Sequence, residues 1–324
     1  MNIIGFLFSL LLFVSLITIS YKLGQVIIEL NVPVLQSANT TKLTLPEEPM
    51  SNFTLRWNHF PLTVYMQTDF IKQKPEYATN FREALNIWQT ATKNLVEFSM
   101  VTSPEADLTV EWVPDLKEKA LDTLGNTDIK FINVSGFGLI QKAKIQLLTK
   151  TNNKQLSETD MINLALHEIG HALGLSHSND ENDIMYPTLT IPTKEIKSIS
   201  QKEIQKLQEI YAIKPKPDLR IVEVNVSKAT VKRFVTTFYL ANISLMVENT
   251  GLLDATSPHL LINADKVKVK QEILPDIPLG NRLNVIFGNL HIENDFNLVE
   301  IIIDPENVIE ELNEENNIAK LYVS

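Results

Sequence analysis

The sequence predicts two domains, a mixed α+β domain followed by an all-β sandwich. The chain has 324 residues, which is long enough for two hydrophobic cores. Between residues 54 and 213, segments of alternating apolar residues are mixed with segments in which apolar residues recur at helical spacing. From residue 218 to residue 324, short apolar runs are separated by turn-forming residues, a pattern typical of a β-sandwich.

The composition is that of an ordinary globular protein, with 44% hydrophobic and 21% charged residues. The formal net charge of -10 argues against a nucleic-acid partner, because phosphate binding requires a concentrated basic face. The chain has no cysteine, so no disulfide can form.

The first 22 residues are expected to target a membrane. Residues 3–20 form an almost unbroken apolar run, which is short for a membrane-spanning helix and long for the core of a signal peptide. We favour an uncleaved anchor slightly over a removed signal. The domains are then expected outside the cytoplasm, either membrane-anchored or secreted. Residues 23–53 contain three prolines and no clear periodicity, so they are expected to be a linker.

The first domain, residues 54–213, begins with a predicted strand at 57–67, where apolar and polar residues alternate. A long amphipathic helix is predicted over 78–98, because apolar side chains recur there at helical spacing: Phe81, Ala84, Leu85, Trp88 and Ala91. Further strands are predicted at 106–113 and 139–148, the latter nearest to the candidate site.

Two capping-box patterns predict where the later helices of this domain begin. Ser157 with Asp160 precedes a helix predicted over 161–175. Ser200 with Glu203 precedes a second helix, which closes the domain.

The candidate site lies between His167 and His177, a segment with three of the six histidines of the chain. His167 and His171 are four residues apart, so on a helix they project from one face and can bind one metal ion. Glu168 beside them is a carboxylate that need not be a ligand. On a straight helix, His177 would lie roughly 120° around the axis from His171. Gly174 tolerates the left-handed conformation that ends a helix, so His177 can complete a three-histidine set with an open fourth position, as in catalytic zinc sites.

The alternative interpretation of this segment is an amphipathic helix whose histidines belong to the core or the surface. A bare H-E-x-x-H pattern would leave that alternative open. It becomes much weaker because Gly174, His177 and Met185 are also in register with the pattern.

The pattern H-E-x-x-H-x-x-G-x-x-H with Met185 downstream is the signature of the metzincins. Ala165 and Leu166 before it, with Ser178 and residues 183–187 after it, resemble the matrixin branch in particular. The resemblance implies a zinc metalloendopeptidase with one catalytic Zn²⁺ on the three histidines and the glutamate as general base.

The resemblance also assigns supporting roles. Met185 would form an apolar floor beneath the histidines without binding the metal, and Gly174 would support the turn. Pro187, Thr188 and Leu189 would line the pocket for the substrate side chain after the scissile bond. Structural Ca²⁺ is possible by the same resemblance, but no residue can be assigned to it.

The rest of the first domain is similar to bacterial-type matrixin domains. In these domains the zinc helix follows an arginine–tryptophan pair, a helix with an inner tryptophan and an alanine–aspartate strand. Arg56 and Trp57 match the pair, Trp88 matches the inner tryptophan, and Ala106 and Asp107 match the strand. By this resemblance, the strand at 139–148 is the edge strand that receives the substrate backbone.

Residues 214–217 read Lys-Pro-Lys-Pro and predict a linker between the two domains. Strands of the second domain are predicted at 219–226, 238–247, 260–269, 284–287 and 296–303. Its turn motifs at 247–251, 304–307 and 313–317 resemble the CARDB module, an immunoglobulin-like sandwich of bacterial and archaeal surface proteins. That resemblance implies a possible surface ligand for the sandwich.

The sequence therefore favours an extracytoplasmic zinc-dependent endopeptidase that acts on protein or peptide substrates. The competing hypothesis is a cell-surface adhesion or interaction protein with a degenerate protease scaffold. Against it, His167, Glu168, His171 and His177 are all present, and a lost ligand or a lost glutamate would have supported it.

Overall fold

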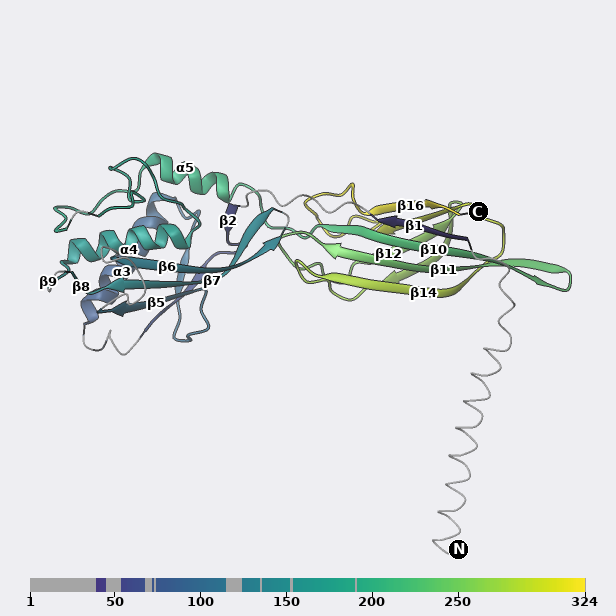
Figure 1. Ribbon diagram of the computed structural model, residues 1–324, viewed down its shortest axis with the longest axis horizontal. Helices are drawn as coiled ribbons and strands as arrows, with labels where there is room; N and C mark the ends of the chain where they lie inside the picture. The colour runs from purple at the N-terminus through teal and green to yellow at the C-terminus, as the bar shows by residue number, and fades with distance from the viewer. Residues whose placement is uncertain are drawn as a thin grey trace, which may run out of the picture.

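The structure, a computed structural model, describes residues 39–44, 54–67, 72, 74–114, 124–134, 136–151, 154–189 and 191–323. They form a mixed α/β domain and a β-sandwich placed end to end (Figure 1). The predicted membrane-targeting segment, residues 1–22, lies outside the described residues. Within the residues that are described, no helix is both long and apolar enough to cross a bilayer.

A six-stranded sheet forms the centre of the first domain, with the order β2-β7-β5-β3-β4 and with β6 paired to β7. β6 runs antiparallel to β7, and the other pairs are parallel. The strands are β2 (Thr54–Arg56), β3 (Leu62–Met66), β4 (Phe98–Met100), β5 (Leu108–Val113), β6 (Gly125–Val134) and β7 (Phe137–Leu148). A small separate ribbon consists of β8 (Lys150–Thr151) and β9 (Lys154–Gln155).

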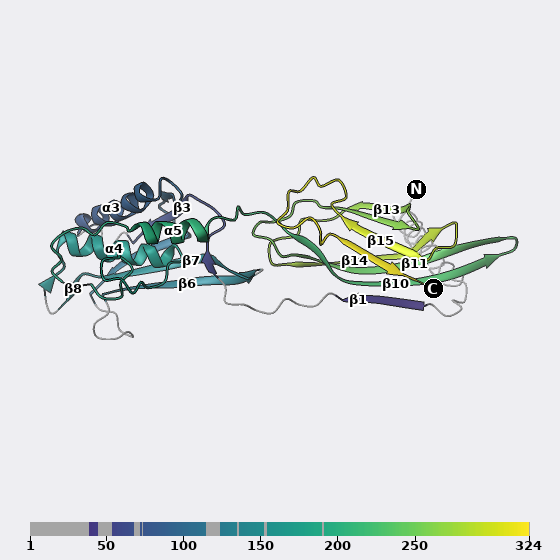
Figure 2. The ribbon, with the colours of Figure 1, turned by 90° about the horizontal axis from the view of Figure 1, so that it is seen from above.

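In the described part of this domain there are three helices: α3 (Pro75–Ala91), α4 (Glu158–Ala172) and α5 (Gln201–Ile210). α3 packs against α4, and α4 packs on β6 and β7 (Figure 2). α3 begins and ends earlier than the predicted range 78–98. Pro75 occupies its first turn, and Lys93 and Asn94 both have left-handed φ values, 54° and 62°, which end the helix before Phe98.

Both predicted capping boxes are confirmed. The Ser157 hydroxyl accepts from Asp160 N at the start of α4, and Ser200 caps α5 in the same way with Glu203. α4 ends at Ala172 and not at 175 as predicted, because Gly174 has a φ of +96°.

The edge strand nearest to α4 is β6, and the prediction that residues 139–148 form that edge is wrong. β7 is an interior strand, since it pairs with β6 on one side and with β2 and β5 on the other. The sequence analysis missed β6 because its side chains are mostly half-buried or exposed, so it shows no clear alternation of apolar and polar residues.

The second domain is a sandwich of two four-stranded antiparallel sheets, ordered β1-β10-β11-β14 and β13-β12-β15-β16. The strands contributed by this domain are β10 (Leu219–Arg233), β11 (Thr236–Asn249), β12 (His259–Ala264), β13 (Val267–Ile273), β14 (Arg282–Ile292), β15 (Leu298–Ile303) and β16 (Ile318–Tyr322). Buried aliphatic side chains of both sheets form one core between them.

Two features of the sandwich differ from the predicted strands. The range 260–269 is not one strand but the β12–β13 hairpin, because Asp265 and Lys266 both have left-handed φ values, 44° and 71°. β16 was not predicted, since the polar segment before it obscured a strand of only five residues.

The predicted linker at 23–53 contains a strand, β1 (Asn39–Thr44), that the sequence analysis did not expect. β1 pairs antiparallel with β10, from Asn39 opposite Lys228 to Thr44 opposite Glu223. This pairing joins segments almost two hundred residues apart, so nothing in the local sequence of the linker could indicate it.

The two domains touch through a small apolar cluster at the tip of the β6–β7 hairpin, which points at the sandwich (Figure 1). Its members are Val134, Phe137 and Leu139 from the first domain and Leu252, Leu279 and Leu312 from the second. Asn58 Nδ2 also donates to the carbonyl oxygen of Leu252 over 2.9 Å. We call this the junction cluster.

Leu252→Asp should loosen the junction without damaging either core, because Leu252 is fully buried but belongs to neither domain core. A carboxylate there would be buried without a partner, which costs several kcal/mol if the junction stays closed. Small-angle scattering should show a larger maximum dimension or a broader distribution of domain separations. Leu253→Asp is the matched control, since Leu253 is already 38% exposed. Identical scattering of the two variants would contradict a junction held by this cluster.

Candidate metal centre

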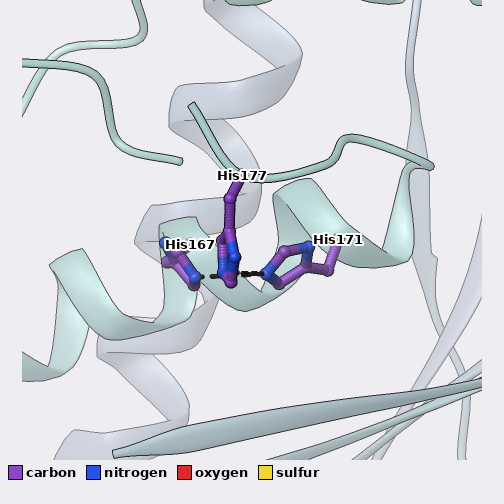
Figure 3. A group of neighbouring side chains, drawn as sticks. All are labelled: His167, His171 and His177. Atoms are coloured by element: carbon purple, nitrogen blue, oxygen red, sulfur yellow. Dashed lines mark hydrogen bonds between the residues drawn. The ribbon is translucent and has the colours of Figure 1, made fainter. Parts of the chain in front are cut away.

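The end of α4 brings the three histidines together (Figure 3). His167 and His171 lie one turn apart on the helix, and the chain turns back at Gly174 to present His177. A Cβ atom at Gly174 would lie 2.3 Å from the carbonyl oxygen of Leu55, so both the left-handed φ and the packing require glycine there.

The ring nitrogens of the three histidines face one another. His171 Nε2 is 3.2 Å from His167 Nε2 and 3.2 Å from His177 Nε2 (Figure 3). All three ligand atoms lie within 4.8 Å of one another.

Backbone carbonyls fix the tautomers of two of these rings. His167 Nδ1 donates to Ile184 O over 2.8 Å, and His171 Nδ1 donates to Leu175 O over 2.9 Å, because a carbonyl oxygen can only accept. The Nε2 atoms of both rings therefore carry lone pairs. Burial lowers the pKa of His167 to about 4 and also lowers the pKa of His171, which keeps both rings neutral near pH 7.

The donor set fits zinc. Two neutral Nε2 lone pairs at 3.2 Å cannot form a hydrogen bond with each other, so their natural partner is a cation. Zinc–nitrogen bonds are about 2.0–2.1 Å long, so two nitrogens in a tetrahedral site lie roughly 3.4 Å apart. Outer carbonyls that hold the second ring nitrogen are the usual support of histidine ligands.

Glu168 lies between α4 and β6 and is only 4% exposed. Its Oε2 accepts a 2.7 Å hydrogen bond from Thr127 Oγ1, which also donates to the Glu168 carbonyl over 3.0 Å. Burial raises the pKa of Glu168 to about 7, and the Thr127 hydroxyl opposes that rise. Gly125 permits this close approach, because a Cβ there would lie within 2.4 Å of Glu168 Oε1.

An open cleft of about 900 Å³ runs between β6 and the histidines. Its wall on the sheet side is β6 (Gly125, Asn126, Thr127 and Ile129), and its other side includes the three histidines, Glu168 and the segment after Met185. β6 pairs only with β7 in the sheet, so among the described strands its other edge faces this cleft.

Met185 packs beneath the histidine helix. A Cβ at Gly170 would lie 2.2 Å from the Met185 sulfur, so only a glycine lets the thioether approach α4 this closely. The backbone N–H of Met185 donates to Glu203 Oε1 over 2.9 Å, and the other oxygen of Glu203 caps α5. The methionine turn is thus tied to the start of the closing helix.

Three aromatic side chains hold the helix in place through its backbone carbonyls. Trp88 Nε1 donates to Leu166 O over 2.9 Å and Trp57 Nε1 donates to Ala172 O over 2.8 Å; the hydroxyl of Tyr211 donates to Leu173 O over 3.0 Å. The bonds to Ala172 O and Leu173 O satisfy carbonyls at the end of the helix, the bond to Leu166 O is made inside it, and together they fix the position of the helix in the domain.

Pro187, Thr188 and Leu189, the predicted pocket residues, line the same cleft. Lys197 lines it too and was missed by the sequence analysis. The Nζ atom of Lys197 donates to the carbonyl oxygens of Glu181 and Asp183, at 2.8 and 3.2 Å.

Gly125 and Thr127 were missed as well. Both contact Glu168 from β6, and Thr127 lies 41 residues before Glu168 in the chain, so no local pattern marks them. Lys197 likewise carries no local signal, because its place in the cleft depends on how the loop after Leu189 folds back.

Comparison with known families agrees with this description. The family model for matrixin matches residues 56–212, and the family model for CARDB matches residues 216–320. Interstitial collagenase B of Mus musculus is 25% identical over 224 residues, covering 63% of this chain and 47% of that protein. Matrix metalloproteinase-26 of Homo sapiens is 28% identical over 170 residues, covering 51% of this chain and 62% of that protein. The chain therefore spans about half the length of these relatives.

Two solved structures are similar to the sandwich. A domain assigned to a cell surface protein of Methanosarcina acetivorans is 25% identical, with a TM-score of 0.27, covering 34% of this chain and 91% of that one. The CARDB domain of a Pyrococcus furiosus protein is 21% identical, with a TM-score of 0.25, covering 34% of this chain and 88% of that one.

Gly170→Ala should destabilise the first domain although alanine favours helices by about 1 kcal/mol over glycine. The added methyl group would overlap the Met185 sulfur, and such overpacking costs roughly 1–3 kcal/mol. Thermal unfolding followed by the helical circular dichroism signal measures the net effect. Gly288→Ala, where the nearest atom would be 3.9 Å away, is the matched control and should change little. A stabilised Gly170→Ala variant would contradict the close packing of Met185.

Proposed function

Because the chain consists of a matrixin domain followed by a CARDB domain, we propose that it is an extracytoplasmic zinc-dependent endopeptidase. The observation that carries this proposal is the convergence of three histidine Nε2 atoms beside a buried carboxylate in an open cleft. Neither the group of histidine nitrogens nor the buried carboxylate stabilises a fold by itself. Together they supply the metal ligands and the general base that metal-assisted hydrolysis of a peptide bond requires.

His167, His171 and His177 would hold the metal ion through their Nε2 atoms. When bound, zinc acts as a Lewis acid and lowers the pKa of a water molecule to about 7. The two carbonyl oxygens at Ile184 and Leu175 keep the first two rings oriented toward the common point.

Glu168 is proposed as the general base. Its carboxylate takes a proton from the attacking water and later delivers that proton to the nitrogen of the leaving amine. The Thr127 hydroxyl occupies Oε2, so Oε1 remains to accept the proton. Thr127 is thus a positioning residue that orients the carboxylate without touching the substrate.

β6 is proposed to bind the backbone of the substrate. The edge of β6 that faces the cleft can pair with an extended peptide, as edge strands do in β-strand addition. A bound peptide would then run along the cleft past Glu168, which lies directly behind Gly125 and Thr127.

The pocket for the side chain after the scissile bond is proposed to include Pro187, Thr188 and Leu189, with Lys197 at its wall. The Lys197 ammonium donates to two neutral carbonyl oxygens, those of Glu181 and Asp183, which do not neutralise its charge. Leu189, which packs against the core of the first domain, supplies an apolar side chain in the same cleft. The substrate class that fits is a peptide with an acidic or long polar side chain at this position.

Zinc analysis and casein hydrolysis of the purified full-length chain test the proposed function together. One zinc per chain is expected, and its removal by a chelator should abolish cleavage. Glu168→Ala should retain zinc but lose roughly 10²–10⁴-fold of its activity, because the metal ligands stay intact while the general base is lost. Glu158→Ala, an exposed glutamate on the same helix, is the matched control and should cleave like the wild type.

The outcomes separate the two hypotheses of the sequence analysis. A folded chain without zinc would sink the endopeptidase and favour an adhesion protein with a degenerate protease scaffold. Bound zinc with full activity in Glu168→Ala would contradict the role of the glutamate alone.

Lys197→Met should change the cleavage preference. In a peptide library varied after the scissile bond, the wild type should prefer acidic over neutral residues of similar size by roughly tenfold, because charge complementarity acts mainly on specificity. The variant should lose that preference and keep its activity on neutral peptides. Lys144→Met, which removes an exposed lysine of β7 paired with Glu111, is the control. An unchanged preference in Lys197→Met would exclude Lys197 as its cause.

A further inference from the structure

The β10–β11 hairpin extends past the rest of the sandwich at the end away from the first domain (Figures 1 and 2). The pairing of β1 with β10 stops at Lys228, and the pairing of β14 with β11 stops at Tyr239. From there to the turn, β10 and β11 pair only with each other among the described strands. The hairpin therefore ends in a two-stranded arm whose last residues, 232–237, are exposed.

The turn of this arm carries two apolar side chains that the fold does not use. Phe234 and Val235 are 101% and 99% exposed. Phe234 also has a left-handed φ of 53°, a conformation that two-residue hairpin turns normally give to glycine or asparagine. The backbone conformation at Phe234 is unfavourable for phenylalanine, and neither Phe234 nor Val235 is buried in the core. An external contact is the physical reason that remains for apolar side chains at these two positions.

Two cations stand directly before this apolar pair. Lys232 and Arg233 are exposed, and the Arg233 carbonyl accepts from Thr236 to close the turn. The arm itself, residues 229–238, contains no acidic residue, and Asp295 outside it is paired with Lys228 at 2.6 Å. An apolar tip with adjacent cations is complementary to a lipid surface with anionic headgroups, where the apolar side chains enter the acyl boundary and the cations meet phosphates.

The register of β1 adds a second argument, which rests on the expectation that residues 1–22 target a membrane. Asn39, the first residue of β1, lies opposite Lys228, and Thr44 lies opposite Glu223, so the chain enters the sandwich from the side of the tip. The apolar run at 3–20 precedes that entry by the eighteen residues 21–38, a stretch that spans at most about 60 Å. The metal centre belongs to the domain at the opposite end of the molecule (Figure 1).

We propose that Phe234 and Val235, preceded by Lys232 and Arg233, form a membrane-docking tip that inserts into an anionic lipid surface. The sandwich then stands on the membrane and holds the first domain away from it. This proposal does not depend on catalysis, so it can fail while the proposed function holds.

Tryptophan fluorescence in the full-length chain tests the docking tip. Phe234→Trp places a reporter at the tip, while the native Trp57, Trp88 and Trp112 are buried in the first domain and give a background that the wild type measures. The probe is a vesicle of phosphatidylcholine and phosphatidylglycerol whose acyl chains carry bromine, which quenches tryptophan on contact. The expected result is a blue shift of the added emission and loss of most of its intensity.

Val308→Trp is the matched control, because Val308 is 73% exposed in the acidic segment at the other end of the sandwich. Any anchoring by residues 1–22 acts equally on both variants, so only contact of the tip itself separates them. The proposal would be overturned if the tryptophan emission of Phe234→Trp remained as solvent-exposed and as unquenched as that of Val308→Trp. It would also be overturned if the tip bound only to another protein and not to the vesicle.

The charge requirement is tested in the Phe234→Trp background. Lys232→Glu with Arg233→Glu, or vesicles of phosphatidylcholine alone, should abolish most of the quenching because the attraction to anionic headgroups is lost. Equal quenching under all of these conditions would overturn the anionic part of the proposal.

Discussion

The metal centre depends on how closely other segments approach the end of α4. Because Gly170 has no side chain, the Met185 sulfur can pack against the helix from below. Gly174 likewise allows the carbonyl oxygen of Leu55 to lie close to the chain where the helix ends. A Cβ atom at Gly174 would lie 2.3 Å from backbone, and one at Gly170 would lie 2.2 Å from the buried Met185 sulfur, whereas metal–ligand distances vary by only about 0.2 Å. Hydrogen bonds from Trp57 and Tyr211 then hold this arrangement through the Ala172 and Leu173 carbonyls, which the helix cannot satisfy itself, and Trp88 adds a bond to the Leu166 carbonyl inside the helix.

The electrostatics of the site follow from this packing. Burial favours the neutral form of His167 and His171, and carbonyl acceptors on Nδ1 direct their Nε2 lone pairs to one point. The same burial favours the protonated form of Glu168, which Thr127 partly offsets by donating to it. The two neutral rings, the Nε2 atom of His177 and one buried carboxyl are therefore brought together for a cation by the fold itself.

The arrangement of the domains connects the cleft to the sandwich. The strand that bounds the cleft, β6, continues into the hairpin whose tip carries Val134 and Phe137 of the junction cluster. Arg56 adds a second connection, since its guanidinium stacks on Phe137 and Tyr211 and donates to the carbonyl of Ile213, where the first domain ends. The sandwich thus supports the edge proposed to bind substrate, and its far end carries the proposed docking tip.

The sequence by itself determined the parts of the protein that local chemistry encodes. Serine caps, the helical spacing of the histidines and the glycine after them are short-range patterns, so both capping boxes and the segment that gathers the histidines could be predicted. Tertiary structure alone decided which strand lies beside the helix. β6 and not β7 is the edge, Gly125 and Thr127 contact Glu168, and β1 joins the sandwich, because each depends on pairing between segments far apart in the chain. Such contacts are selected by the packing of the whole domain and leave no periodic trace in the segments that make them.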